Sequence, residues 1–187
     1  MNLAHAVVCS SGWWERTVER DLLPWGLGGV ELGDDVLEIG PGFGATTRVL
    51  ARRRGSLTVV ELSESYCRRL RSRLGDEVEI VQADATAMPF ADGRFSGVVC
   101  FTMLHHVPSP ELQDRLLAEA ARVLRTGGVF AGTDSLGTGR AFKLLHLHDT
   151  LVPVAPDGLP ARLEGAGLLE PHVDTGARSF RFRAVAA

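Results

Sequence analysis

The chain has 187 residues, of which 45% are hydrophobic and 23% charged, and its formal net charge is -3. These values suit one soluble domain with a sizeable core. The negative balance argues against a nucleic-acid partner, because phosphate backbones bind to clustered basic residues. The cysteines, Cys9, Cys67 and Cys100, form no C-x-x-C pair, so neither a disulfide framework nor a cysteine-ligated zinc site is expected.

The first residues show no basic region followed by an apolar core, so they predict no secretory signal. No stretch approaches the roughly 20 uninterrupted apolar residues that span a bilayer. A cytoplasmic location without a membrane span is therefore expected. Many Ala, Gly and Arg residues with a single lysine, Lys143, are typical of a GC-rich bacterial genome.

Strand-like and helix-like stretches alternate along the chain, which is typical of a parallel sheet with helices on both faces. In chain order the predicted elements are a helix at 15–23, a strand at 36–39, a helix at 46–54, a strand at 57–60, a helix at 64–74, strands at 78–81 and 97–101, a helix at 110–124, a strand at 129–133, a helix at 159–166, and strands at 171–175 and 179–185. The stretch 134–158 is irregular.

The last two predicted strands are separated only by a short turn at Gly176-Ala177. They must pair antiparallel, because a parallel crossover needs a dozen or more residues. The expected fold is therefore a doubly wound α/β sheet of five parallel strands followed by an antiparallel C-terminal hairpin. One domain, 1–187, is expected, with an N-terminal cap segment (1–30), a cofactor-binding core (34–133) and a substrate-side segment with the hairpin (134–187).

A glycine-rich loop, Gly40-Pro41-Gly42-Phe43-Gly44, connects the first predicted strand to a helix. Glycine lets the backbone turn sharply and approach a ligand closely. The helix start that follows offers free N–H groups and the positive end of a dipole to a carboxylate or phosphate. The loop therefore predicts a nucleotide-like ligand at this edge of the sheet.

Three consecutive predicted strands each end near an acidic residue: Glu38, Glu61 and Asp84. Glu61 lies about 20 residues past the loop, where an acid accepts hydrogen bonds from ribose hydroxyls. Together the three acids predict a pocket for an adenosine that carries hydroxyls and a cationic group. Gly40, Gly42 and Ala45 also fit the G-x-G-x-x-A dinucleotide fingerprint, so these residues alone leave a nicotinamide-dependent oxidoreductase open.

The order of several further motifs along the chain distinguishes between these two kinds of ligand. They are Val36-Leu37-Glu38-Ile39-Gly40-Pro41-Gly42-Phe43-Gly44, Val59-Val60-Glu61-Leu62-Ser63, Asp84-Ala85-Thr86-Ala87-Met88-Pro89-Phe90, Phe95-Ser96-Gly97-Val98-Val99-Cys100, Leu104-His105-His106-Val107 and Ala121-Arg122-Val123-Leu124-Arg125-Thr126-Gly127-Gly128. In this combination the chain resembles the class I S-adenosylmethionine-dependent methyltransferases, and most of all the small-molecule branch related to ubiquinone and menaquinone methyltransferases. The resemblance implies a Rossmann-like, mostly parallel seven-stranded sheet.

The resemblance also implies which residues contact the cofactor: Glu38, Gly40, Pro41, Gly42, Gly44, Glu61, Leu62, Asp84, Ala85, Phe101 and Thr102. Glu38 and the glycine loop would hold the methionine moiety, and Glu61 would bind both ribose hydroxyls. Leu62 would flank the adenine, Asp84 would accept from its amino group, and the backbone of Ala85 would meet a ring nitrogen. The two residues after the fourth strand would line the cofactor near the transferred methyl.

Methyl transfer from a sulfonium is a direct displacement, and positioning alone can contribute about 7–11 kcal/mol. A base is needed only if the acceptor must lose a proton. His105 and His106 are the candidate bases, because they follow the fourth strand at the pocket rim. The other interpretation is that one belongs to the loop structure and the other is solvated.

No metal is expected, because His146 and His148, at i and i+2, diverge on a helix. Trp13 and Trp14 either cover the pocket or pack against the sheet edge. The acceptor is expected to be a small molecule of unassigned identity, and no oligomeric state is predicted. A non-catalytic cofactor-binding protein on the same fold is the remaining alternative.

Overall fold

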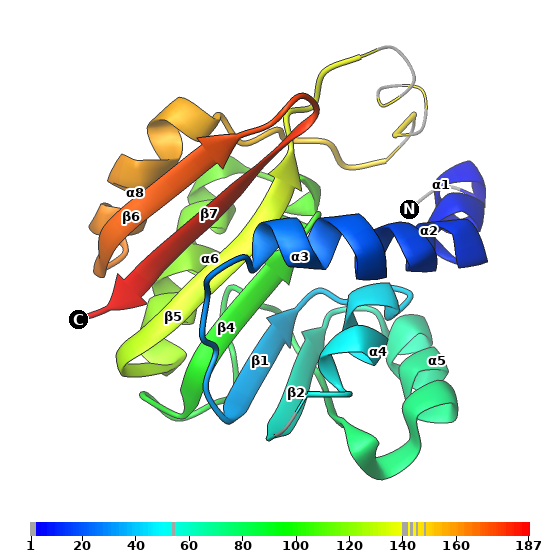
Figure 1. Cartoon of the computed structure of the whole chain (residues 1–187), viewed down its shortest axis with the longest axis horizontal. Coiled ribbons are helices and arrows are strands. Elements are labelled where there is room, and N and C mark those ends of the chain that lie inside the picture. The colour runs from blue at the N-terminus through cyan, green and yellow to red at the C-terminus, as the bar shows by residue number, and fades with distance from the viewer. Residues whose placement is uncertain (1–2, 54, 140–141, 143, 145, 148) are drawn as a thin grey trace.

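A seven-stranded sheet forms the centre of the structure, a computed structural model that describes residues 3–53, 55–139, 142, 144, 146–147 and 149–187 (Figure 1). The strand order is β3-β2-β1-β4-β5-β7-β6. The strands are β1 (Asp35–Ile39), β2 (Ser56–Glu61), β3 (Glu79–Gln82), β4 (Phe95–Phe101), β5 (Leu124–Ser135), β6 (Leu168–Thr175) and β7 (Ser179–Ala186). The first five pair in parallel, whereas β7 pairs antiparallel with both β5 and β6.

Helices cover both faces of this sheet. They are α1 (Leu3–Cys9), α2 (Gly12–Thr17), η1 (Val18–Leu22), α3 (Leu23–Gly26), α4 (Ala45–Leu50), α5 (Glu64–Leu74), η2 (Gly75–Glu77), η3 (Leu104–His106), α6 (Pro110–Val123), η4 (Pro156–Gly158) and α8 (Leu159–Gly165). Figure 1 shows α3 and α4 in front of the sheet and α6 and α8 behind it. Two buried clusters follow from this layering, one on each face.

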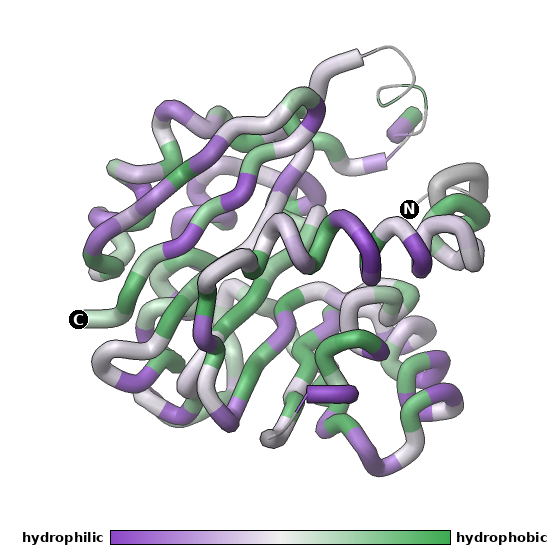
Figure 2. Tube along the Cα trace, in the orientation of Figure 1, coloured by the Kyte–Doolittle hydropathy of each residue, from purple (hydrophilic) through white to green (hydrophobic). Residues whose placement is uncertain are grey.

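The central strands are apolar because both of their faces are covered. Every residue of β1 after Asp35 is buried, and β4 is buried at all but one position. The hairpin strand β7 instead alternates between buried and partly exposed residues, and Figure 2 shows the matching alternation of hydropathy along it. The expected mostly parallel sheet with an antiparallel C-terminal hairpin is confirmed.

The N-terminal helical segment differs from its prediction. The sequence predicts a helix over 15–23 that stops near Pro24, but helical structure continues from Gly12 to Gly26. Val18–Leu22 is a π-helical turn, in which the N–H of Leu23 bonds back to the carbonyl of Val18. Pro24 lacks an N–H, and the chain continues past it because the proline falls in the first turn of α3. α1 was not predicted at all.

The boundary between α6 and β5 is also corrected. The sequence places Leu124 on a helical face and starts the strand at Val129, whereas the helix ends at Val123 and β5 begins at Leu124. Leu124 pairs with Phe95 of β4 across a register shift, and its side chain is buried. Apolar periodicity did not reveal this, because Leu124 would be buried in either conformation.

Other boundaries shift by smaller amounts. α4 ends at Leu50 rather than at residue 54, which lies outside the described residues, and β6 begins three residues earlier than predicted, at Leu168. Among the described residues, no helix has the length and apolarity needed to cross a membrane.

Candidate functional site

The carboxyl ends of the parallel strands share one edge of the sheet. Figure 1 shows the arrowheads of β1, β4 and β5 pointing toward the side where the segment after β5 also lies. β1 is flanked by β2 on one side and β4 on the other, so the strand order reverses between β1 and β4. Ligands of open α/β sheets bind outside the strand ends at this reversal.

The glycine loop follows β1 at this reversal, and its glycines serve different purposes. All three have positive φ: 63° at Gly40, 54° at Gly42 and 78° at Gly44. A Cβ at Gly40 would overlap the side chain of Met103, and one at Gly44 would meet Leu70, so both glycines permit close packing. A Cβ at Gly42 would have no described atom within 4 Å, which leaves that position open to a ligand.

Glu38, at the end of β1, is buried beneath the loop with only 1% of its surface exposed. Its Oε1 accepts a hydrogen bond from the hydroxyl of Thr46 at the start of α4, while its Oε2 has no partner among the described residues. Burial raises the pKa of Glu38 to about 7, against the opposing hydrogen bond from Thr46. A cationic group facing Oε2 would relieve this cost.

Glu61, at the end of β2, joins the glycine loop to the next helix. Its Oε2 accepts from the backbone N–H of Gly42 at 3.1 Å, and its Oε1 accepts from the N–H of Ser63 at 2.8 Å. The nearby Glu61 charge also contributes to the raised pKa of Glu38. The structure thus brings together two of the three predicted acids and the open glycine of the loop.

The remaining predicted cofactor residues border this group in more exposed positions. Leu62 is 68% exposed, and Asp84 is exposed as well. The Asp84 carboxylate accepts from the N–H and hydroxyl of Thr86, both at 2.8 Å, which fixes the turn after β3. Ala85 is partly buried. Among the described residues no hydrogen bond or ion pair joins the Asp84 side chain to Glu38 or Glu61, although the N–H of the preceding Ala83 donates to the Glu61 carbonyl at 3.2 Å.

The end of β4 supplies Phe101 and Thr102. Phe101 is buried, and it packs where a Cβ on Gly26 of α3 would stand. Thr102 has a φ of 50°, and its N–H donates to the carbonyl of Thr133 at 2.7 Å. This left-handed turn at a non-glycine residue costs of order 1–2 kcal/mol and is held by the neighbouring strand.

His105 and His106 follow in η3, and their environments differ. His105 is buried, and both its N–H and its ring Nδ1 bond to the carboxylate of Asp134, a fully buried residue near the end of β5. His106 is half-buried, and its Nδ1 lies 3.2 Å from the carbonyl of Thr150. His146 packs against both imidazoles, whereas His148 lies outside the described residues.

The two tryptophans of α2 differ in their exposure to solvent. Trp14 packs against the buried cluster on the α3 face, while Trp13 is 61% exposed, and both interpretations of this pair stay predictions.

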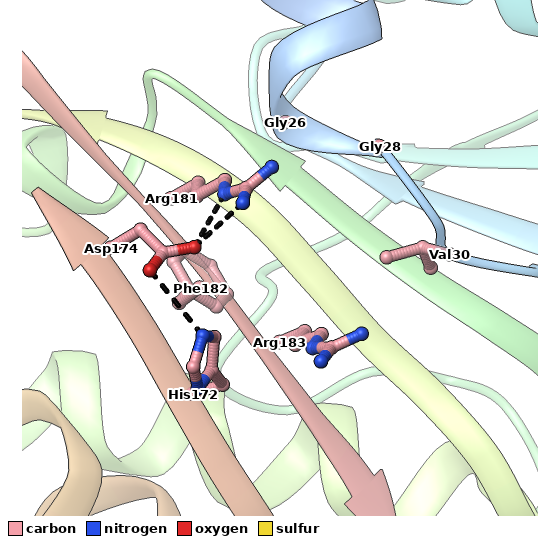
Figure 3. A pocket seen from close by; sticks show the side chains of 8 residues that line it. All are labelled: Gly26, Gly28, Val30, His172, Asp174, Arg181, Phe182 and Arg183. Carbon is pink, nitrogen blue, oxygen red and sulfur yellow. Dashed lines mark hydrogen bonds and ion pairs between the residues drawn. The ribbon is translucent and has the colours of Figure 1, made fainter. Parts of the chain in front are cut away.

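A hollow of about 90 Å³ lies on the antiparallel half of the sheet (Figure 3). It is lined by Gly26, Gly28, Val30, His172, Asp174, Arg181, Phe182 and Arg183. The Asp174 carboxylate forms ion pairs with the guanidinium of Arg181 at 2.7 Å and with Nε2 of His172 at 3.3 Å. None of the predicted site residues lines this hollow, and pockets for cofactor-sized ligands are larger, roughly 300–1,000 Å³. This hollow is therefore not the cofactor site.

Sequence reasoning missed Thr46, Met103 and Asp134. Asp134 could have been found, because it stands near the end of the fifth strand as Glu38 and Glu61 stand at the ends of the first and second. Thr46 and Met103 carry no such signal, since their roles depend on the side chain of Glu38 and the backbone of Gly40 respectively.

Comparisons with known proteins bear on these residues. Residues 37–132 match the methyltransferase domain family. The chain is 39% identical over 108 residues to a fatty-acid O-methyltransferase of Mycolicibacterium smegmatis, covering 55% of this chain and 38% of that protein. It is 35% identical over 124 residues to a ubiquinone/menaquinone biosynthesis C-methyltransferase of Hahella chejuensis, covering 62% and 46%. The chain thus spans less than half the length of these two relatives.

A solved structure shows the same fold over nearly the whole chain. It is that of a methyltransferase of Thermotoga maritima described as a possible histamine N-methyltransferase, with a TM-score of 0.78 and 19% identity, covering 98% of this chain and 97% of that one. The family match decides between the two cofactors that the glycine loop left open. The chain belongs to the class I S-adenosylmethionine-dependent methyltransferases.

Proposed function

We propose that this protein transfers a methyl group from S-adenosylmethionine to a small-molecule acceptor. The observation that carries the proposal is the buried carboxylate of Glu38, whose Oε2 has no described partner, directly below a glycine loop whose middle glycine is open. A buried carboxylate without a counter-charge is costly, and a cationic ligand offsets the cost.

The described residues fit this cofactor at both of its polar ends. Glu38 and the Gly40–Gly44 loop would hold the methionine moiety, where an ammonium group meets the carboxylate. Glu61 already faces the loop through Gly42, and its carboxylate has the acceptors that a ribose diol requires. Leu62, exposed beside it, would cover the adenine.

The outer parts of the cofactor would meet the remaining residues. Asp84 and the backbone of Ala85 would bind the adenine edge, and Phe101 and Thr102 would line the reacting end. Bound here, the cofactor supplies an electrophilic methyl on sulfur. The chain itself fixes the geometry, since the strained turn at Thr102 and the packed glycines leave little freedom at the strand ends.

The acceptor would approach from the side of η3. His105 and His106 stand there, after β4, and Asp134 holds the His105 ring through Nδ1. Such a contact sets the tautomer, because the carboxylate accepts a hydrogen bond from Nδ1–H and leaves the lone pair on Nε2 as the basic nitrogen. His105 is therefore our candidate for taking a proton from an acceptor that has one to lose, and His106 is the second.

Turnover tests the proposal directly. We expect the purified chain to form S-adenosylhomocysteine from S-adenosylmethionine when offered a panel of small carboxylic acids, phenols, quinols and amines, followed by mass spectrometry of the methylated product. Relatives named for fatty-acid and quinone methylation motivate the first members of the panel. Cofactor binding without turnover across the whole panel would instead support a non-catalytic role.

A further inference from the structure

Three histidines from two distant parts of the chain converge beside the strand ends. His105 and His106 lie in η3, and His146 lies in the segment that follows β5. The ring centroids are 4.3 Å apart for His105–His106, 5.2 Å for His105–His146 and 5.3 Å for His106–His146. One ring nitrogen from each lies within 4.8 Å of the others.

Each ring turns its Nδ1 toward an oxygen acceptor. The acceptors are the Asp134 carboxylate for His105, the Thr150 carbonyl at 3.2 Å for His106 and the Phe142 carbonyl at 2.8 Å for His146. A carbonyl or carboxylate can only accept, so the neutral form of each ring would carry its proton on Nδ1. The lone pair of each imidazole is then on Nε2. Metal-ligating histidines typically donate their other N–H to such oxygens.

We propose that His105, His106 and His146 form a binding site for a divalent transition-metal cation of the zinc class. Three imidazole nitrogens suit Zn²⁺ and its neighbours in the first row, whereas Mg²⁺ and Ca²⁺ prefer oxygen. Three protein ligands leave a fourth position open, as in catalytic zinc sites.

The charge of the surroundings favours a cation. Asp134 is completely buried, and its described partners are His105 and the N–H of Ser135, with no arginine among them. Buried charges are normally paired or coordinate metals. A cation on His105 would complete a carboxylate–histidine–metal chain and offset the Asp134 charge, while packing of the rings alone would not.

The site would also fasten the segment after β5 to the core. That segment already returns to η3 through the N–H of Val152, which donates to the His105 carbonyl at 2.8 Å. Gln113 of α6 donates to the carbonyls of Leu104 and Val152 and holds both sides of this junction. The cation would therefore lie on the acceptor side of the fold, with its open position available to water or to an acceptor oxygen or nitrogen.

Metal binding and proton acceptance compete for the same atom. Nε2 of His105 cannot hold a cation and take a proton together, so the base role proposed above belongs to the metal-free chain. The sequence predicted no metal because it paired His146 with His148. The fold instead pairs His146 with His105 and His106.

The test uses tag-free protein stripped with EDTA and then titrated with Zn²⁺ by calorimetry and with Co²⁺ by visible absorption. We expect one equivalent to bind, with the Co²⁺ spectrum of a four-coordinate site. His106→Ala and His146→Gln should each lower Zn²⁺ affinity by about 100-fold or more, beyond the roughly 10–100-fold loss typical of a positioning partner, which is the range expected for Asp134→Asn.

His172→Ala is the matched control, because His172 lies on β6 outside the cluster and is largely exposed. It should bind Zn²⁺ as the wild type does. His106 is half-buried, so its variant is expected to keep the wild-type circular-dichroism spectrum. Absence of stoichiometric Zn²⁺ binding by the folded wild type, or equal affinity in His106→Ala and wild type, would overturn the inference. Titration of the EDTA-treated protein with S-adenosylhomocysteine shows separately whether the proposed function holds.

Discussion

Replacing Glu61 with alanine is expected to weaken binding of S-adenosylhomocysteine by at least about 100-fold. The Glu61 carboxylate would lose its hydrogen bonds to two ribose hydroxyls, and each bond to a charged group contributes about 1.5–3 kcal/mol. A loss of about 1.4 kcal/mol corresponds to tenfold in affinity. The same substitution removes the acceptor of the Gly42 N–H, so the glycine loop also loses a hydrogen bond that holds it in place. Isothermal titration calorimetry measures the change.

Two further variants separate these contributions. Glu61→Gln keeps one carbonyl oxygen and should bind with an intermediate affinity. Glu64→Ala, at an exposed position of α5 three residues away, should leave cofactor affinity unchanged, since its carboxylate pairs with Arg68 on the helix surface. Wild-type affinity in Glu61→Ala would refute the role assigned to Glu61.

Replacing Glu38 with glutamine is expected to make the ligand-free protein more stable at pH 8 while weakening its cofactor binding. Burial raises the pKa of Glu38 from 4.5 to about 7. The folded state therefore binds the proton more tightly than the unfolded state does. The stabilisation of the fold by this proton on Glu38 is complete below pH 4.5 and is lost as pH rises through 7. Above pH 7 the ionised carboxylate costs of order 3 kcal/mol.

Thermal unfolding followed by circular dichroism tests whether Glu38→Gln stabilises or destabilises the ligand-free protein. Glu38→Gln should raise Tm by about 5–10 °C at pH 8, and the difference should shrink toward zero near pH 4.5. A lower Tm for the variant at pH 8 is the contrary result, and it would mean that the ionised carboxylate is stabilised within the chain itself.

Cofactor affinity should move in the opposite direction. Glutamine carries no charge and cannot form an ion pair with an ammonium group, so Glu38→Gln should bind S-adenosylhomocysteine about 10- to 100-fold more weakly, the equivalent of one charged hydrogen bond. Calorimetry in buffers of different ionisation enthalpy should also show proton release when the wild type binds below pH 7. Gain of stability with loss of binding is the pattern expected of a functional residue held at a cost to folding.

Much of the parallel half of the fold could be predicted because its strands are covered on both faces. Val59 and Val60 in β2, like Val98 and Val99 in β4, are almost fully buried, and such apolar runs between turn signals identify strands without knowledge of their partners. Locating these strands also located the site residues at the ends of β1 and β2, because the carboxyl ends of parallel strands lie at the same edge of the sheet.

The parts that escaped prediction depend on tertiary contacts. The π-turn at Val18–Leu22 precedes α3, whose first turn holds Pro24, and no local propensity indicates such a turn. The pairing of His105 with Asp134 joins residues 29 positions apart, and His146 reaches them from a segment without a recognisable pattern. Contacts between segments this distant are set by the closed fold and cannot be inferred from spacing in one sequence.

We expect the residues at the ends of β1 and β2, Glu38 and Glu61 with the glycine loop, to bind S-adenosylmethionine. Calorimetric titration of the wild-type chain with S-adenosylhomocysteine tests it most directly, with NADH as the comparison ligand. Saturable binding of one S-adenosylhomocysteine per chain, and none of NADH, is the predicted result. A folded protein that shows no heat of binding at high micromolar S-adenosylhomocysteine, or that binds NADH in its place, would contradict the account.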